Sequence, residues 1–253
     1  FEDALIAFEQ AIEYDSASAP LWACRGMSLY RLLRLREAVE AFQKALKREP
    51  LNETALWYRG KAYYKLGKFP EALSMFERLL AHHENQVAGW YYKGLTLEQL
   101  GRPADALSAF NTTLGLDPAC AKAWSRKGVV LNALGEYGEA VLACDFALEQ
   151  EPGIPGCSYE KAVALFRLGR YPEAIASFDN AIANDPKDFR ALEGKGRALI
   201  AIGQFADAVP FLTQAAGIDT GNPAVWYVLG LALLKSGRSE DAAGAFDKTY
   251  DLD

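Results

Sequence analysis

Apolar residues along this chain recur three and four positions apart, in stretches of about 14 residues. This spacing places the apolar side chains on one face of a helix, so each stretch predicts an amphipathic helix. The stretches come in pairs, and a glycine separates the two members of most pairs: Gly67, Gly101, Gly135, Gly169, Gly203 and Gly237. Glycine takes the left-handed backbone conformation at little cost, so it ends the first helix in a tight turn. The pattern therefore predicts a series of helix–turn–helix units.

The units follow one another with a fixed period of 34 residues, from one end of the chain to the other. An alanine marks this period without a slip: Ala4, Ala38, Ala72, Ala106, Ala140, Ala174, Ala208 and Ala242. Such a period is typical of an array of identical supersecondary units. Helices of about 14 residues are marginally stable alone, so each unit must bury its apolar faces against its neighbours. We therefore expect an all-α solenoid.

Further residue types recur in register with this alanine. They are Trp22, Trp90, Trp124 and Trp226; Gly26, Gly60, Gly94, Gly128, Gly196 and Gly230; Phe8, Phe42, Phe76, Phe110, Phe178 and Phe246; and Pro50, Pro118, Pro152 and Pro186. Small residues on facing sides let two helices approach closely, and the phenylalanine fills the space beside them. Cys144 stands in one of the phenylalanine positions.

The order Trp, Gly, Gly, Ala, Phe, Pro at fixed offsets resembles the tetratricopeptide repeat, and the resemblance covers the whole chain. It implies an α-solenoid of antiparallel helix pairs that forms a right-handed superhelix. We expect a single array over residues 1–253, in which residues 1–18 are the second half of a truncated repeat. The repeats are then expected at residues 19–52, 53–86, 87–120, 121–154, 155–188, 189–222 and 223–253.

Some places depart from the pattern of the array. Leu33 stands where the other turns have glycine, so that turn must use a different conformation or accept strain. The repeat at 189–222 carries Gly194 and Gly196 inside its first helix and Pro210 inside its second. Glycine and proline destabilise a helix interior, so we expect this repeat to be the softest.

The sequence offers no candidate catalytic residue, cofactor site or metal site. Phosphate-binding loops and nucleophile elbows are absent, and the only histidines, His82 and His83, are adjacent instead of four apart on one helix face. The four cysteines have no CxxC spacing, and we interpret them as free thiols, with Cys144 as a small core residue. Free thiols and the absence of a visible signal peptide lead us to expect a cytoplasmic protein.

Charge and hydropathy narrow the class of partner. No apolar run approaches the roughly 18 residues of a membrane span, so we expect no membrane partner. The net charge is −6, the pI is near 5.2, and no continuous basic stripe is present, which argues against nucleic acid.

The family resemblance indicates where a protein partner would bind. In tetratricopeptide repeats the first helix lines a concave groove, and its second, fifth, ninth, twelfth and thirteenth positions tend to face the partner. Only two of the 33 acidic residues fall on these positions, Glu98 and Glu193. Of the 27 basic residues, eight do: Arg31, Lys61, Lys65, Lys122, Arg167, Arg190, Arg197 and Lys235. A cationic groove would favour acidic or carboxylate-bearing ligands.

Aromatic residues occupy the same positions: Tyr30, Trp57, Tyr64, Tyr91, Tyr159, Phe166 and Tyr227. We expect Tyr30, Phe166 and Tyr227 to pack between helices. Trp57 lies one place beyond the recurrent tryptophan position, where Leu56 fills the core, so we expect Trp57 to face the groove. Aromatic residues beside cations are typical of recognition sites. The predicted peptide-binding residues are Trp57, Lys61, Tyr64, Tyr91, Lys122, Arg126, Tyr159 and Arg197.

Chaperone-binding members of the family grip a peptide's terminal carboxylate with lysine, asparagine and arginine side chains. Of the corresponding residues here only Lys122 and Arg126 match, because Trp57 stands in a lysine position, and Lys61 and Tyr92 stand in the two asparagine positions. The sequence therefore argues against that clamp. It still predicts that Lys61, Lys122 and Arg126 converge where an anionic group could bind.

Three functional hypotheses follow. The first is a non-catalytic scaffold that binds an extended or helical peptide segment in the groove. The second is the substrate-recognition arm of a larger enzyme, such as a glycosyltransferase, whose catalytic domain lies outside this chain. The third is an assembly module that associates with itself through exposed apolar ends.

Overall fold

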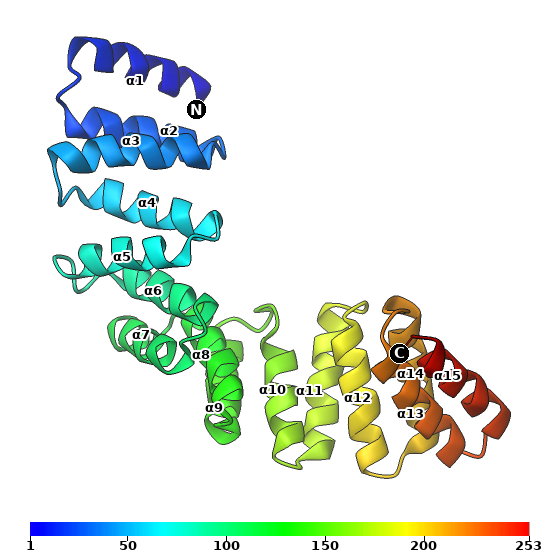
Figure 1. Ribbon diagram of the computed structural model, residues 1–253. Helices are drawn as coiled ribbons and strands as arrows, with labels where there is room; N and C mark the ends of the chain where they lie inside the picture. Colours follow the sequence, from blue (N-terminus) through cyan, green and yellow to red (C-terminus); the bar gives the residue numbers. More distant parts are fainter. Residues whose placement is uncertain (253) are drawn as a thin grey trace. The chain divides into compact units, whose positions relative to one another are not determined.

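The computed structural model describes residues 1–252, and every regular element in them is an α-helix (Figure 1). The first seven helices are α1 Glu2–Tyr14, α2 Ala19–Arg31, α3 Leu35–Arg48, α4 Glu53–Lys65, α5 Phe69–Leu80, α6 Val87–Gln99 and α7 Pro103–Leu116. They are followed by α8 Ala121–Leu134, α9 Tyr137–Gln150, α10 Cys157–Arg167, α11 Tyr171–Asn184, α12 Phe189–Ala201, α13 Phe205–Ile218, α14 Pro223–Lys235 and α15 Ser239–Leu252. The all-α prediction is confirmed.

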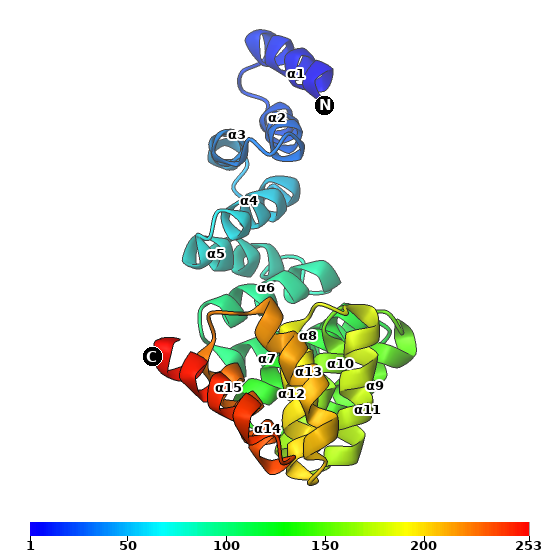
Figure 2. The same ribbon diagram turned by 90° about the vertical axis from the view of Figure 1, so that its right-hand side faces the viewer.

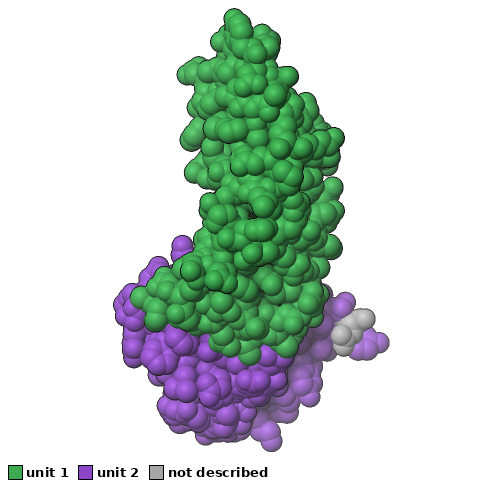
Figure 3. Space-filling view, turned by 90° about the vertical axis from the view of Figure 1, so that its left-hand side faces the viewer, with its two compact units in different colours: residues 1–119 green, residues 120–253 purple. Residues whose placement is uncertain are grey.

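The chain divides into two compact units, distinguished by colour in Figure 3. Unit 1 comprises residues 1–119 and contains α1 to α7, whereas unit 2 comprises the remainder and contains α8 to α15. The single array expected over residues 1–253 stays a prediction.

Within each unit the helices stack as antiparallel pairs, as Figures 1 and 2 show. Each first helix packs on the second helix of its own pair, and, where its unit contains one, on the second helix that precedes it. First helices also contact one another, α2 with α4 and α4 with α6 in unit 1, and α8, α10, α12 and α14 in succession in unit 2. Among the described residues no such contact joins successive second helices. The first helices therefore lie closer together, and they form the inner face of each unit.

The recurrent glycine and phenylalanine pack against each other within a pair. A Cβ atom added to Gly94 on α6 would lie 2.6 Å from the ring of Phe110 on α7. Equivalent contacts join Gly26 with Phe42, Gly60 with Phe76 and Gly230 with Phe246. A Cβ atom does not fit at these distances, so glycine sets the approach of the two helices. The predicted use of small residues is confirmed.

In the repeat at 189–222, which we expected to be the softest, close packing requires glycine at two positions inside the first helix. A Cβ atom at Gly194 would lie 2.4 Å from the ring of Phe178, and one at Gly196 would lie 2.5 Å from Leu212. Helix α12 is continuous through both glycines, and α13 is continuous through Pro210. The softness of this repeat stays a prediction.

Leu33 adopts the strained alternative foreseen for its turn. Its φ is 61°, while the six glycines at the equivalent turns have φ between 68° and 85°. The left-handed conformation costs a residue with a Cβ atom about 1–2 kcal/mol. The leucine side chain is 69% exposed, so little burial offsets this cost.

We therefore expect Leu33→Gly to raise the free energy of unfolding by about 1 kcal/mol, after the entropic cost of glycine is subtracted. Urea denaturation followed by circular dichroism measures this change. Leu168 is the control, because it is also an exposed leucine at a helix end but has φ −78°. Leu168→Gly should lower stability, and an equal effect of the two changes would contradict the assignment of strain to Leu33.

Candidate functional site

Four aromatic rings surround one lysine on the inner face of unit 1. Lys61 on α4 places its Nζ 5.1 Å from the ring centroid of Trp57, 5.2 Å from Tyr92, and 5.7 Å from both Tyr30 and Tyr58. These distances are within the range of cation–π attraction. We call these five residues the Lys61 cluster.

Three successive first helices supply the cluster. Trp57 and Lys61 are four residues apart on α4, so they share one face of that helix. Tyr30 comes from the end of α2, where its ring meets Tyr58 edge-on at 5.4 Å. Tyr92 comes from α6 and meets Trp57 edge-on at 5.2 Å. The contacts between first helices thus bring the rings together.

The cluster carries positive charge without a paired carboxylate. Within residues 1–252 no ion pair engages Lys61, Lys65 or Arg31. Burial among the rings lowers the pKa of Lys61, and the charges of Lys65 and Arg31 lower it further. Lys65 itself lies 4.9 Å from the ring of Tyr30. A partly desolvated ammonium beside two other cations would gain from an approaching anion.

The remaining predicted residues of unit 1 border the cluster. Tyr64 contacts the ring of Tyr92 at 6.0 Å and that of Phe69 at 5.6 Å. Tyr91 lies 5.8 Å from Tyr92, edge-on. The half-buried Trp57 also packs on Phe76 at 5.9 Å, so intramolecular contacts hold part of its ring.

Unit 2 contains the other predicted residues. Lys122 and Arg126 are four apart on α8, and both are exposed. Tyr159 on α10 and Arg197 on α12 line a cavity of about 420 Å³. Burial raises the pKa of Tyr159, although the guanidinium of Arg190 lowers it in part.

A comparison with protein-family models identifies the repeat. A tetratricopeptide repeat model matches residues 25–81, 59–114, 91–153 and 159–223, and a second tetratricopeptide repeat model matches residues 199–249. Together the matches span most of the chain. This chain belongs to the tetratricopeptide repeat (TPR) family.

Solved TPR proteins have the same fold. YrrB, described as a TPR protein with an unusual peptide-binding site, is 26% identical with a TM-score of 0.68, over 75% of this chain and 97% of YrrB. A TPR protein from Parabacteroides merdae ATCC 43184 is 22% identical with a TM-score of 0.69, over 97% of this chain and 93% of that one. PilW, a type IV pilus biogenesis factor, is 22% identical with a TM-score of 0.69, over 85% of this chain and 98% of PilW. No curated protein sequence matches the chain.

The recurrent tryptophan of the TPR pattern has a structural role that Trp57 does not share. The indole N–H groups of Trp22, Trp90 and Trp226 donate hydrogen bonds to the carbonyl six residues earlier, at 2.7–3.1 Å. These bonds hold the loop that precedes each first helix. In the described residues the indole of Trp57 makes no such bond, and it faces the Lys61 cluster.

Tyr58 and Tyr92 are members of the cluster that were not predicted to bind the peptide. Both occupy the sixth position of a first helix, outside the positions expected to face the groove. The signal that could have found them is the recurrence of tyrosine at this position, 34 residues apart.

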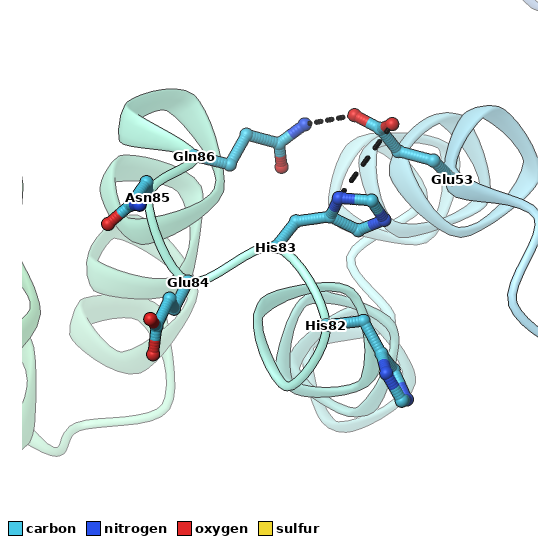
Figure 4. A pocket seen from close by; sticks show the side chains of 6 residues that line it. All are labelled: Glu53, His82, His83, Glu84, Asn85 and Gln86. Carbon is cyan, nitrogen blue, oxygen red and sulfur yellow. Dashed lines mark hydrogen bonds and ion pairs between the residues drawn. The ribbon is translucent and has the colours of Figure 1, made fainter.

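A shallow pocket beside the turn after α5 contains both histidines (Figure 4). Nδ1 of His83 lies 3.9 Å from Oε2 of Glu53, and Nε2 of Gln86 donates a hydrogen bond of 3.0 Å to Oε1 of the same carboxylate. Helix α5 ends at Leu80, so the histidines follow the helix and are not inside its last turn. Over residues 1–252 no group of three or more metal-ligating side chains is present.

The four cysteines are free thiols, as predicted, and Cys144 is fully buried in its phenylalanine position. Its sulfur takes the place of the ring beside Gly128, where an added Cβ atom would lie 2.7 Å from it. In the described part of the chain no helix has the length and apolar character needed to span a bilayer.

Proposed function

We propose that this TPR protein is a non-catalytic interaction scaffold that binds an acidic peptide segment at the Lys61 cluster. The observation that carries the proposal is an ammonium group held among four aromatic rings with no ion-pair partner in residues 1–252. Rings of this size supply apolar contact area, and the ammonium supplies a charge-assisted hydrogen bond to a carboxylate.

Neighbouring charges favour an acidic ligand over other classes. Arg31 and Lys65 flank Lys61, so the potential at the cluster is positive although the whole chain has a net charge of −6. Nucleic acid would require a wider basic surface than three residues supply. An acidic peptide needs a few carboxylates near Lys61 and apolar side chains for the rings.

Several further points support peptide binding. YrrB, with 26% identity over most of its length, is described as having a peptide-binding site. We include Tyr64 and Tyr91 as contacts at the edge of the cluster. Lys122, Arg126, Tyr159 and Arg197 are proposed contacts within unit 2. The four free thiols suit the reducing cytoplasm that we propose as its location.

Affinity capture from a lysate of the source organism tests this function. Wild-type protein, the variant Trp57→Ala with Lys61→Glu, and the control Lys47→Glu would be immobilised in parallel. Lys47 is exposed on α3, a second helix, so its replacement makes the same change of charge away from the inner face. We expect a protein that wild type and control retain and that the double variant loses at least about tenfold.

Equal retention by all three proteins would overturn the proposal. Recovery of only the chain itself, together with a mass that rises with concentration, would do so too. That result would favour self-association through exposed apolar side chains such as Ile6 on α1 and Tyr250 on α15.

A further inference from the structure

The cavity of unit 2 lies on the inner face, between α10 and α12, and Phe178 of α11 contributes to its wall. Its volume is about 420 Å³, which is within the range of sites that enclose a small ligand. Tyr159, Phe166 and Phe178 supply aromatic surface, and Arg167, Arg190 and Arg197 supply positive charge.

The register of the repeats explains why this cavity exists. Gly194 stands at the sixth position of α12, where α4 has Tyr58 and α6 has Tyr92. In unit 1 the ring of Tyr58 stacks on Phe42 at 6.2 Å, and the ring of Tyr92 lies 5.8 Å from Phe76. At Gly194 no such ring is present, and the ring of Phe178 lies where the side chain of residue 194 would begin.

The floor of the cavity is also particular to this repeat. Ala162 replaces the glycine that receives the phenylalanine ring in four other pairs. The ring of Phe178 lies instead against the backbone at Gly194, 2.4 Å from where a Cβ atom would be. A side chain at residue 194 is therefore excluded, and the aromatic floor remains open to the cavity.

The charges at the cavity differ in how they are paired. The guanidinium of Arg190 lies 4.8 Å over the ring of Tyr159 and pairs with Asp188 at 3.2 Å. Arg197 pairs with Glu193, one turn away on α12, at 2.7 Å. Arg167 has no ion pair within residues 1–252. One exposed guanidinium is thus available to an anion, and the carboxylate of Glu193 disfavours a ligand of high negative charge.

We propose that this cavity is a second peptide-binding site, which takes an aromatic side chain flanked by an acidic residue. The ligand ring enters the cavity and packs against Phe178 and Tyr159. The neighbouring carboxylate pairs with Arg167. The inference relies on the proposed function for the class of ligand only, because it uses none of the residues of the Lys61 cluster.

An NMR titration with blocked tripeptides tests the site in the Trp57→Ala, Lys61→Glu background, where the Lys61 cluster is disabled. The probe is acetyl-Asp-Phe-Asp-amide. One comparison peptide replaces the phenylalanine by alanine, and another replaces both aspartates by asparagine. We expect amide shifts that locate binding to α10 and α12, with Kd about 1 mM, the weak affinity usual for so small a ligand.

Each comparison peptide should bind at least about tenfold more weakly than the probe. Arg167→Glu should weaken the binding of the probe by a similar factor. Lys248→Glu, at an exposed lysine on α15, should leave the binding of the probe unchanged. Val163→Trp fills the cavity without changing its charges and should also abolish the shifts. Circular dichroism confirms that each variant is folded.

Three results would overturn the inference: no shifts on α10 and α12, equal affinity for the probe and the alanine peptide, or no effect of Arg167→Glu. None of these results bears on the Lys61 cluster. Conversely, loss of peptide binding at the Lys61 cluster leaves the titration of unit 2 unchanged. The two proposals therefore fail independently.

Discussion

Replacement of Phe110 by alanine should lower the free energy of unfolding by about 3–5 kcal/mol, the range for a large side chain removed from a close-packed core. Phe110 is fully buried, and its ring contacts α6 where Gly94 leaves no side chain. Alanine would leave a void that two backbones in contact cannot easily close. Gly94, which faces the ring, has no side chain that could move into the void.

Urea denaturation measures the total loss, and hydrogen exchange with mass spectrometry locates it. In a repeat array the destabilisation should be concentrated in α6, α7 and the helices that pack on them, since each repeat contacts only its neighbours. Phe146→Ala is the control, because Phe146 is 45% exposed and stacks on Trp124. A loss at Phe110 no larger than the loss at Phe146 would contradict the role assigned to the glycine–phenylalanine contact.

Reversal of the charge at Lys61 should weaken the binding of an acidic peptide segment about a hundredfold. Removal of the charge by Lys61→Met should weaken it about tenfold, because a charge-assisted hydrogen bond contributes about 1.5–3 kcal/mol. Lys61→Glu adds repulsion, since the new carboxylate would face the carboxylate of the ligand among the rings.

Isothermal titration calorimetry with the segment identified by affinity capture measures both changes. Lys47→Glu again serves as the control of equal charge in unit 1, and it should change the Kd less than about twofold, as expected for a remote surface charge. If Lys61→Met binds as tightly as wild type while Trp57→Ala does not, the rings alone hold the peptide and its acidic character is irrelevant.

The helical architecture could be predicted from the sequence because it depends on local residues at a strict period. Apolar spacing gives helices, and the turn glycines have the positive φ expected of them. Helix α1 spans Glu2–Tyr14, within the half repeat expected over residues 1–18. Leu33 shows how far the period dominates, because the turn keeps its left-handed conformation even where the residue disfavours it.

The candidate sites could be predicted only in part, because they depend on how rings tilt between helices. The pattern selected Trp57 and Lys61, but it gave no reason to include Tyr58, which enters through its contact with Phe42. At the cavity of unit 2, Ala162 stands where four other pairs have glycine, and Gly194 leaves room for the ring of Phe178. Neither residue is unusual alone.

The ion pairs between repeats could not be predicted from the sequence either. Lys93 pairs with Glu77 at 3.8 Å and Arg25 with Glu9 at 2.8 Å, in each case between a first helix and the second helix before it. Lys161 with Asp145 and Lys195 with Asp179 repeat the arrangement. The spacing of sixteen residues is constant, but it becomes meaningful only when the faces of adjacent helices are known.

A charge swap between the protein and its peptide tests the central claim most directly. The peptide carboxylate that is proposed to pair with Lys61 would be replaced by an amine. The original and the amine peptide would each be titrated into wild type and Lys61→Glu. We predict that the amine peptide binds wild type weakly and regains at least about tenfold affinity with Lys61→Glu. If the preference of the protein for the acidic peptide is the same in wild type and Lys61→Glu, Lys61 does not contact the ligand, and the proposed site is wrong.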